Sequence, residues 1–245
     1  MDSGYYAAVS GWVARNQAVD TAAANLANAQ TSGFRAGREY FRSILVADDA
    51  NESQVGQALN RFGLVGGTRL SSTQGPRQRT GNALDMAVEG AGFFAIQSSN
   101  GLRLTRDGSF HRSQSGLLVT STGDPVLSQT KQQIPIPPGE VAVGADGSLS
   151  VSGAIFGTLG VFEVSDAAQL KAEGANRYVL TDQASLSPSR TSVVHQGELE
   201  GSNQDVIGGS LDLLLMQRQT EMMQKALMVF HTEFNKLASE DLPRV

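Results

Sequence analysis

The fold is decided by two stretches of sequence, YYAAVSGWVARNQAVDTAAANL at residues 5–26 and LLLMQRQTEMMQKALMVFHTEFNKL at residues 213–237. In both stretches the apolar positions recur in alternating steps of three and four residues. This period of roughly 3.5 residues is typical of coiled-coil helices, whose apolar seam packs against a partner helix. The seam positions are Tyr5, Val9, Trp12, Asn16, Val19, Ala23 and Leu26 in the first stretch, and Leu213, Met216, Thr220, Met223, Leu227, Phe230, Phe234 and Leu237 in the second.

Two seam positions, Asn16 and Thr220, carry polar side chains. A buried asparagine fixes helix register at some cost in stability, and the alternative is that the helix shifts its face at these points. The second stretch is also rich in methionine, which fills irregular gaps and adapts to several partner surfaces, although a methionine stripe also suits plain core packing. The sequence leaves both alternatives open.

The first predicted helix covers residues 3–29 and is rich in alanine, the best helix former. Between Met1 and Phe34 the charged residues are Asp2, Arg15 and Asp20. Because a free surface helix carries many charges on its outer face, this helix is expected to have neighbours on several sides. Gly33, just beyond its end, is expected to take the left-handed backbone conformation that ends many helices.

The second predicted helix covers about residues 206–238, with Ser202 or Asp205 as its cap.

Between the two predicted helices the pattern of apolar and polar residues changes twice. The composition of residues 35–80 predicts a linker or adaptable segment, and its first part, residues 35–46, is predicted to be either a short helix or a strand.

From residue 81 the apolar period becomes two and turn pairs such as Asp107-Gly108 recur, which predicts short strands. The predicted strands are 93–96, 102–104, 116–120, 126–127, 134–136, 155–164 and 177–180. The sequence therefore predicts an α+β fold, with terminal helices paired as a coiled coil and a central all-β domain, a sandwich or small barrel. The predicted domains are residues 1–34 for the N-terminal helix, 35–80 for the linker, 81–200 for the β domain and 201–245 for the C-terminal helix.

Composition excludes several classes of function. The net charge of −5 comes without a basic cluster, which argues against nucleic-acid binding. Cysteine is absent from the sequence, so disulfides and thiolate metal sites are excluded. No stretch approaches the roughly 18 consecutive apolar residues of a membrane span. The first cation is Arg15 and no apolar run follows it, so any export is expected to proceed without a cleaved signal peptide.

Motifs for catalysis or cofactors are weak. The stretch GAGFFA at residues 90–95 has the spacing of a dinucleotide loop, but a predicted strand follows it where that loop needs a helix. The histidines His111, His195 and His231 lie in separate segments without metal-ligand spacing. We therefore expect no enzyme activity, cofactor, metal or small-molecule substrate. The alternative from another class is an oligomeric β-domain enzyme or carbohydrate-binding protein.

Five blocks of the sequence resemble the axial proteins of the bacterial flagellum, the family of rod and hook subunits. NLANAQTSGFR at 25–35 is similar to the N-terminal signature of this family, and LDMAVEGAGFF at 84–94 is similar to its central block. LTRDGSF at 104–110 and GLLVT at 116–120 resemble the pieces that follow, and QGELEGSN at 196–203 matches the turn before the last helix. The motif residues at the two ends are Asn25, Leu26, Ala27, Asn28, Thr31, Gly33 and Phe34, and Leu199, Glu200, Ser202 and Asn203.

The resemblance implies a structural subunit of the flagellar basal-body rod. In this family the terminal helices pair into a coiled-coil inner layer that lines a central channel, and the β domain contacts neighbouring subunits from an outer layer. The implied partners are further copies of the chain, other rod subunits and the flagellar type III export apparatus. The implied location is the rod that spans the periplasm, where helical assembly transmits torque.

Within the family, the Met-Asp start, the LEGSN form and the length are most similar to the proximal-rod F subunit. A distal-rod subunit or a hook-like subunit is the alternative. One stretch departs from the family pattern: residues 218–221 read RQTE, where the family has RxYE or RxFE. Thr220 therefore replaces an aromatic seam residue, which predicts weaker or differently partnered packing there.

Overall fold

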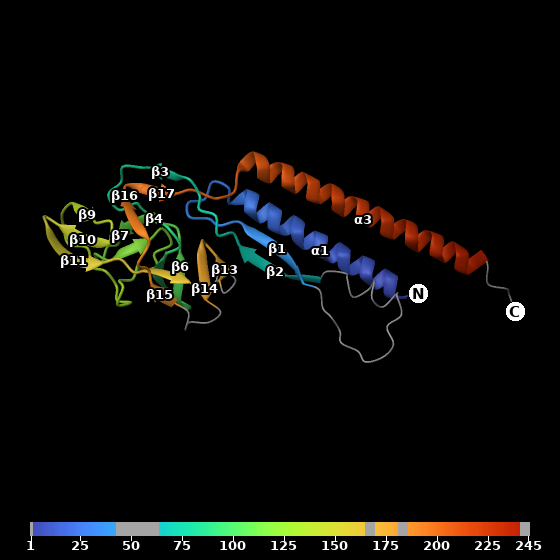
Figure 1. Ribbon diagram of the computed structural model, residues 1–245, viewed down its shortest axis with the longest axis horizontal. Coiled ribbons are helices and arrows are strands. Elements are labelled where there is room, and N and C mark those ends of the chain that lie inside the picture. Colours follow the sequence, from blue (N-terminus) through green and yellow to red (C-terminus); the bar gives the residue numbers. More distant parts are fainter. Residues whose placement is uncertain (1, 43–63, 165–169, 181–185, 241–245) are drawn as a thin grey trace. The chain divides into compact units, whose positions relative to one another are not determined.

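A computed structural model describes residues 2–42, 64–164, 170–180 and 186–240 (Figure 1). The chain divides into two compact units. The first unit consists of residues 1–26, 38–68 and 207–245, and the second consists of residues 27–37 and 69–206. The first unit therefore takes its two helices from opposite ends of the sequence.

The first unit contains helix α1, Asp2–Ala27, and helix α3, Val206–Glu240, which lie side by side (Figure 1). Strands β1, Gly37–Arg42, and β2, Leu64–Leu70, form a two-stranded ribbon whose larger part belongs to this unit. Thr21 Oγ1 of α1 donates a hydrogen bond of 2.8 Å to Glu39 Oε1 of β1. The two helices have nearly the predicted bounds.

The least exposed positions of α3 repeat in steps of three and four residues. Between residues 209 and 229, which the structure describes throughout, all remaining residues are exposed. The buried or half-buried positions are Gly209, Leu213, Met216, Thr220, Met223 and Leu227. Five of these six are predicted seam positions, and the side chains of Phe230, Phe234 and Leu237 lie outside the described residues.

Thr220 is buried in this face although its side chain carries a hydroxyl group. The hydroxyl donates a 2.9 Å hydrogen bond to the carbonyl oxygen of Met216, one turn earlier in the helix. Such a bond satisfies the buried donor without a partner from another element. Threonine is therefore accommodated at this buried position.

In the single chain, helix α1 buries positions outside the predicted seam. Its most buried positions are Ala14 and Ala18, both outside the predicted seam. Asn16 and Ala23 are exposed, and the remaining described seam positions, Val9, Trp12, Val19 and Leu26, are half-buried. Ala14 and Ala18 have small side chains, which let neighbouring backbone approach closely. Tyr5 lies outside the residues with described side chains.

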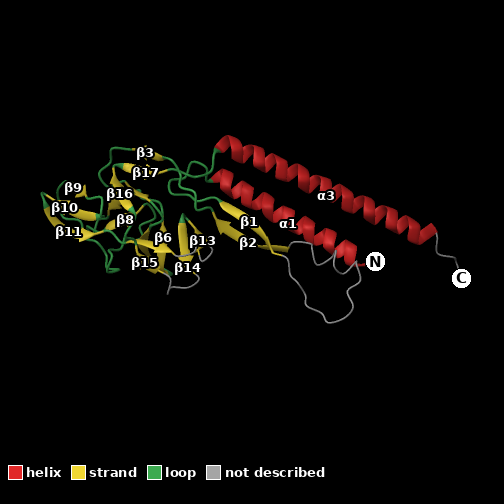
Figure 2. Cartoon of the chain, viewed as in Figure 1, coloured by secondary structure: helices red, strands yellow, loops and turns green. Residues whose placement is uncertain are grey.

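The second unit is all β apart from its ends, with strands drawn in yellow in Figure 2. Its largest sheet has six strands in the order β13-β14-β6-β5-β12-β15, each paired antiparallel to its neighbours. These strands are β13 (Leu170–Gly174), β14 (Arg177–Leu180), β6 (Gly101–Thr105), β5 (Phe93–Ser98), β12 (Val161–Val164) and β15 (Leu186–Pro188).

Smaller sheets complete this unit. Three strands pair in the order β11-β10-β9, and the pairs β16-β4, β17-β3 and β7-β8 form two-stranded sheets. Their bounds are β3 (Arg77–Arg79), β4 (Met86–Glu89), β7 (Phe110–Arg112), β8 (Leu118–Thr120), β9 (Val141–Val143), β10 (Ser148–Val151), β11 (Ala154–Thr158), β16 (Val193–Gln196) and β17 (Glu198–Glu200).

The core of the second unit is apolar and closely packed. Phe94 is fully buried, and its ring meets that of Phe110 edge-on with centroids 5.0 Å apart. A second cluster of buried residues forms around Leu104, Phe162 and Tyr178. Most predicted strands are present, but 126–127 and 134–136 make only isolated bridges.

The segment expected to be a linker is partly ordered into strands. Of the two alternatives for residues 35–46, the strand is the one observed, at β1. Strands β2 and β3 also fall within residues 35–80, and residues 43–63 lie outside the described part of the chain. None of the described helices is long and apolar enough to cross a membrane.

Candidate functional site

The second unit holds together the segments that lead out of α1 and into α3. Gly33 lies beyond the end of α1 with φ of +70°, the left-handed conformation expected of it. Its backbone N–H donates a 2.7 Å hydrogen bond to the carbonyl oxygen of Glu200. A Cβ atom at position 33 would lie only 2.2 Å from the backbone nitrogen of Asp107. This close approach requires glycine.

A buried ion cluster lies beside this contact, with one carboxylate between two guanidinium groups. Arg35 Nη2 is 3.0 Å from Glu200 Oε1, and Arg106 Nη1 is 3.0 Å from Glu200 Oε2. All three residues are at most 4 % exposed. The backbone N–H of Gly75 also donates to Glu200 Oε1, at 3.3 Å. We call Arg35, Arg106 and Glu200 the ion cluster.

Backbone carbonyl groups accept further hydrogen bonds from the Nη atoms of the two arginines, while their buried Nε atoms have no partner among the described residues. Arg35 Nη1 donates to the carbonyl oxygens of Ser72 and Thr73 at 2.7 and 3.0 Å. Arg106 Nη1 donates to that of Val88 at 3.0 Å, and its Nη2 donates to that of Gly90. These bonds matter because the cluster buries two positive charges against one negative charge, and an unpaired buried charge is costly.

Burial changes the pKa of Arg106, which belongs to the ion cluster, and the pKa of Tyr178, which lies beside it. Burial lowers the pKa of Arg106 to about 10, although Glu200 acts in the opposite direction. Burial also raises the pKa of Tyr178 to about 12, and the Tyr178 hydroxyl accepts a hydrogen bond from the Arg35 backbone N–H at 3.2 Å. At neutral pH the arginine is therefore charged and the phenol is neutral.

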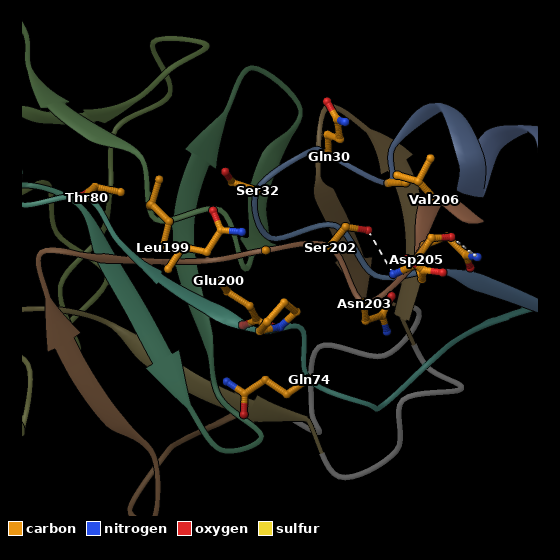
Figure 3. Close-up of a pocket in the computed structure, with 15 residues that line it drawn as sticks. Gln30, Ser32, Gln74, Thr80, Leu199, Glu200, Ser202, Asn203, Asp205 and Val206 are labelled. Carbon is orange, nitrogen blue, oxygen red and sulfur yellow. Dashed lines mark hydrogen bonds between the residues drawn. The ribbon is translucent and has the colours of Figure 1, made fainter. Parts of the chain in front are cut away.

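Asn203 joins the same segments through its side-chain amide. Its Oδ1 accepts a 2.7 Å hydrogen bond from the backbone N–H of Ala36, and its Nδ2 donates at 2.8 Å to the carbonyl oxygen of Thr73. Ser202 is buried, and its Oγ accepts a bond from the backbone N–H of Gln204 at 3.1 Å. Figure 3 shows Glu200, Ser202 and Asn203 in sequence on the stretch that leads into α3.

These residues border a polar cavity of about 650 Å³. Amide and hydroxyl side chains line much of it, among them Gln30, Ser32, Gln74 and Thr80 (Figure 3). Of its carboxylate residues, Glu200 is paired with both arginines and Asp205 is exposed at the start of α3. Within the described residues no three histidine, aspartate or glutamate side chains form a group that could hold a metal ion.

Comparison of the sequence with those of known proteins identifies the family of this chain. The flagellar basal-body rod protein FlgF of Caulobacter vibrioides is 33% identical to the chain, and the match covers 100% of both proteins. The chain belongs to the family of flagellar basal-body rod proteins. The rod protein FlgF of Rhizobium meliloti is 35% identical over 89% of each chain, and FlgG of Buchnera aphidicola from Acyrthosiphon pisum is 30% identical over 87% of this one and 90% of its own length.

Two family models also match parts of this rod protein. The flagella basal body rod protein model matches residues 6–35, and the model of the flagellar hook protein FlgE/F/G D1 domain matches residues 87–151. A rod protein is a structural subunit and not an enzyme. The site that matters is therefore the set of surfaces and junctions through which the subunit is built into the rod.

The structure brings some of the predicted motif residues of the rod protein together. Gly33, Glu200 and Asn203 meet at the ion cluster, and Phe34 accepts a 3.4 Å bond from the Asn203 N–H through its carbonyl oxygen. Asn25 and Leu26 lie near the end of α1 in the other unit. The remaining motif residues lie along the segments that flank the cluster, namely Ala27, Asn28, Thr31, Leu199 and Ser202.

The sequence reasoning missed the partners of Glu200. Arg35 and Arg106 each lie inside a quoted motif, but nothing in one sequence pairs residues that are 165 and 94 positions from Glu200. The available signal was that each arginine stands beside a glycine-containing turn in a motif otherwise free of basic residues. That signal marks the arginines as unusual but does not identify their common carboxylate.

We predict that Glu200→Gln lowers the free energy of unfolding of the β unit by about 3–5 kcal/mol, since it leaves two buried guanidinium groups without a carboxylate. Glu198→Gln is the matched control, because Glu198 pairs with Arg77 and Arg79 near the surface and such pairs contribute about 0–1 kcal/mol. Urea-induced unfolding followed by circular dichroism measures both. Equal, small effects would contradict the proposed importance of the cluster.

A second prediction concerns Gly33. Gly33→Ala adds a methyl group to a left-handed residue, which costs about 1–2 kcal/mol, and forces it against the backbone of Asp107, which adds about 1–3 kcal/mol. Gly81→Ala is the control, since Gly81 has φ of +77° but no atom within 4 Å of the added Cβ. The difference between the two variants in urea unfolding isolates the steric contact. Identical losses of stability would show that the contact is unimportant.

Proposed function

We propose that this rod protein assembles through its two terminal helices into an open helical rod, with the β unit as the outer layer. The observation that carries the proposal is a row of apolar side chains on the surface of α3. Ile207, Leu211, Leu215, Met222 and Val229 are each between 54 and 73% exposed in the single chain. An exposed apolar surface of this extent on a structural subunit indicates a protein interface.

These residues lie on the opposite side of α3 from its buried face. A step of two residues rotates about 200° around an α-helix, so Leu211 and Leu215 point away from Leu213, and Met222 points away from Thr220. We call Ile207, Leu211, Leu214, Leu215, Met222 and Val229 the outer stripe. Helix α3 therefore has apolar residues on two opposite faces, and one helix partner covers only one of them.

We infer that α1 and α3 of one chain pair as a coiled coil through the buried face of α3. In support, a Cβ atom on Gly11 would lie 3.7 Å from Met223 Cε, an ordinary contact distance. The three-and-four spacing of Leu213, Met216, Thr220, Met223 and Leu227 agrees with such packing. The predicted seam of α1, which has exposed members, is then available to neighbouring subunits.

A contact between two different faces generates a helical filament where its rotation does not close a ring, and we propose that open case here. Paired helices in the inner layer would line the central channel and transmit torque along the rod. The partners are further copies of this chain and other rod subunits. Delivery to the periplasm-spanning rod would proceed through the flagellar type III export apparatus.

The relatives support a proposal for the position of this chain in the rod. The relatives named FlgF reach 33 and 35% identity, and the FlgG of Buchnera aphidicola from Acyrthosiphon pisum reaches 30%. We propose the proximal rod. A distal-rod or hook-like position is the second candidate, because the D1 model that matches residues 87–151 is shared by FlgE, FlgF and FlgG.

The outer stripe gives a direct test in a strain that lacks the chromosomal gene for this chain. Met222→Asp is expected to abolish both swimming and recovery of the chain in purified basal bodies, because a charge replaces an apolar contact. Burial of such a side chain contributes about 1.5–3 kcal/mol at each of many repeated contacts. Swimming is measured in soft agar, and the chain in basal bodies by immunoblotting.

Ile155→Asp is the matched control, because Ile155 is 71% exposed but lies on β11 in the β unit. This variant is expected to swim. The circular dichroism of both purified variants should equal that of the native chain, since both positions face solvent. Normal swimming by a strain that carries Met222→Asp would contradict assembly through the outer stripe.

A further inference from the structure

Helix α1 presents to solvent a face that is almost free of charge. Its exposed residues between positions 13 and 24 are Val13, Asn16, Gln17, Asp20, Ala23 and Ala24. Asp20 is the one charged residue among them. Its carboxylate makes no hydrogen bond or ion pair with any part of the chain that the structure describes, so it is a free negative charge on a small, uncharged surface.

The outer stripe of α3 has large apolar side chains, and two exposed positive charges lie along it. Arg218 is exposed near its middle, between Leu215 and Met222, and its guanidinium has no hydrogen bond or ion pair among residues 2–42, 64–164, 170–180 and 186–240. Lys225 is exposed one heptad further along. An arginine in an apolar stripe is costly to cover unless a carboxylate arrives with the covering surface.

We propose that α1 of one copy of this chain covers the outer stripe of α3 of another copy, with Asp20 paired to Arg218 across the interface. This inference rests on the assembly proposed above and names the two faces and the charge pair that set their register. The small side chains Ala23 and Ala24 leave room for the large side chains of the stripe, so that the surfaces interdigitate.

The pair forms between copies and not within one chain. Gly11, which faces Met223 of the same chain, and Asp20 are nine residues apart, which is about two and a half turns and places them on opposite sides of α1. Likewise the outer stripe lies opposite the buried face of α3. The two faces that carry the free charges both point away from the contact inside the chain.

One charge pair in a largely apolar contact determines register. An apolar stripe on a smooth alanine-rich face could slide by one heptad at little cost, as in coiled coils whose register depends on one polar residue. A slip by one heptad would leave Arg218 buried without a carboxylate, and would leave Asp20 unpaired or set it against Lys225, so the wrong alignment is opposed by the unpaired arginine. Arginine suits this role because its planar guanidinium group can bind a carboxylate through two parallel hydrogen bonds.

Charge reversal tests the pair in the same deletion strain. Asp20→Arg and Arg218→Asp should each cause loss of swimming and of the chain from basal bodies, because each places like charges together. The double variant Asp20→Arg/Arg218→Asp should recover both. Glu140→Arg, on an exposed residue of the β unit, and Lys225→Asp, on the next heptad, are the controls and should swim. Failure of the double variant to recover, or loss of swimming by Lys225→Asp alone, would overturn the proposed pair.

Cross-linking separates this inference from the proposed function. The native chain contains no cysteine, so Asp20→Cys and Arg218→Cys can be expressed as two separate single-cysteine chains in one cell. A short bismaleimide added to basal bodies should give a covalent dimer that contains one chain of each kind. A chain that is present in basal bodies without forming this dimer would overturn the register pair but not the rod function. A chain absent from basal bodies, with the native control also absent, would overturn the rod function itself.

Discussion

The β unit depends on one buried carboxylate. Glu200 holds Arg35 on one side and Arg106 on the other, each at 3.0 Å. The three residues come from the end of the N-terminal segment, the middle of the chain and the start of the C-terminal segment. Carbonyl groups of the loop at residues 71–73 and of strand β4 accept further hydrogen bonds from the two buried cations, whose Nε atoms have no partner among the described residues. The cluster thus fixes the entry and exit of the chain in the β unit at one point.

The neighbours of the cluster reinforce the same junction. Gly33 and Asn203 bind the backbone of the opposite segment, and a Cβ atom at position 33 would clash with the backbone of Asp107. The conformations from which α1 and α3 leave the β unit are therefore set inside that unit.

Sequence periodicity predicted the two helices well because a long apolar repeat has few alternatives. It also predicted which positions of α3 are least exposed, from Leu213 to Leu227. In α1 the positions buried within the single chain, Ala14 and Ala18, lie outside the predicted seam, which stays a prediction. In an alanine-rich helix every face looks apolar, so periodicity does not select one. The ion cluster was beyond prediction because its pairing depends on how the strands fold, and short strands such as β3 and β17 carry too few residues for a pattern.

Amide hydrogen exchange of the isolated chain, resolved to single residues by NMR, tests the central role of the cluster most directly. The informative amides are those of Gly33, Ala36, Gly75 and Gly201, which bind Glu200, Asn203 or the backbone of Pro76. If the cluster holds the β unit together, these amides exchange as slowly as that of Ala95 in the central strand β5, through global unfolding alone. Exchange of all four on the timescale of frayed chain ends, while Ala95 stays protected, would contradict the account.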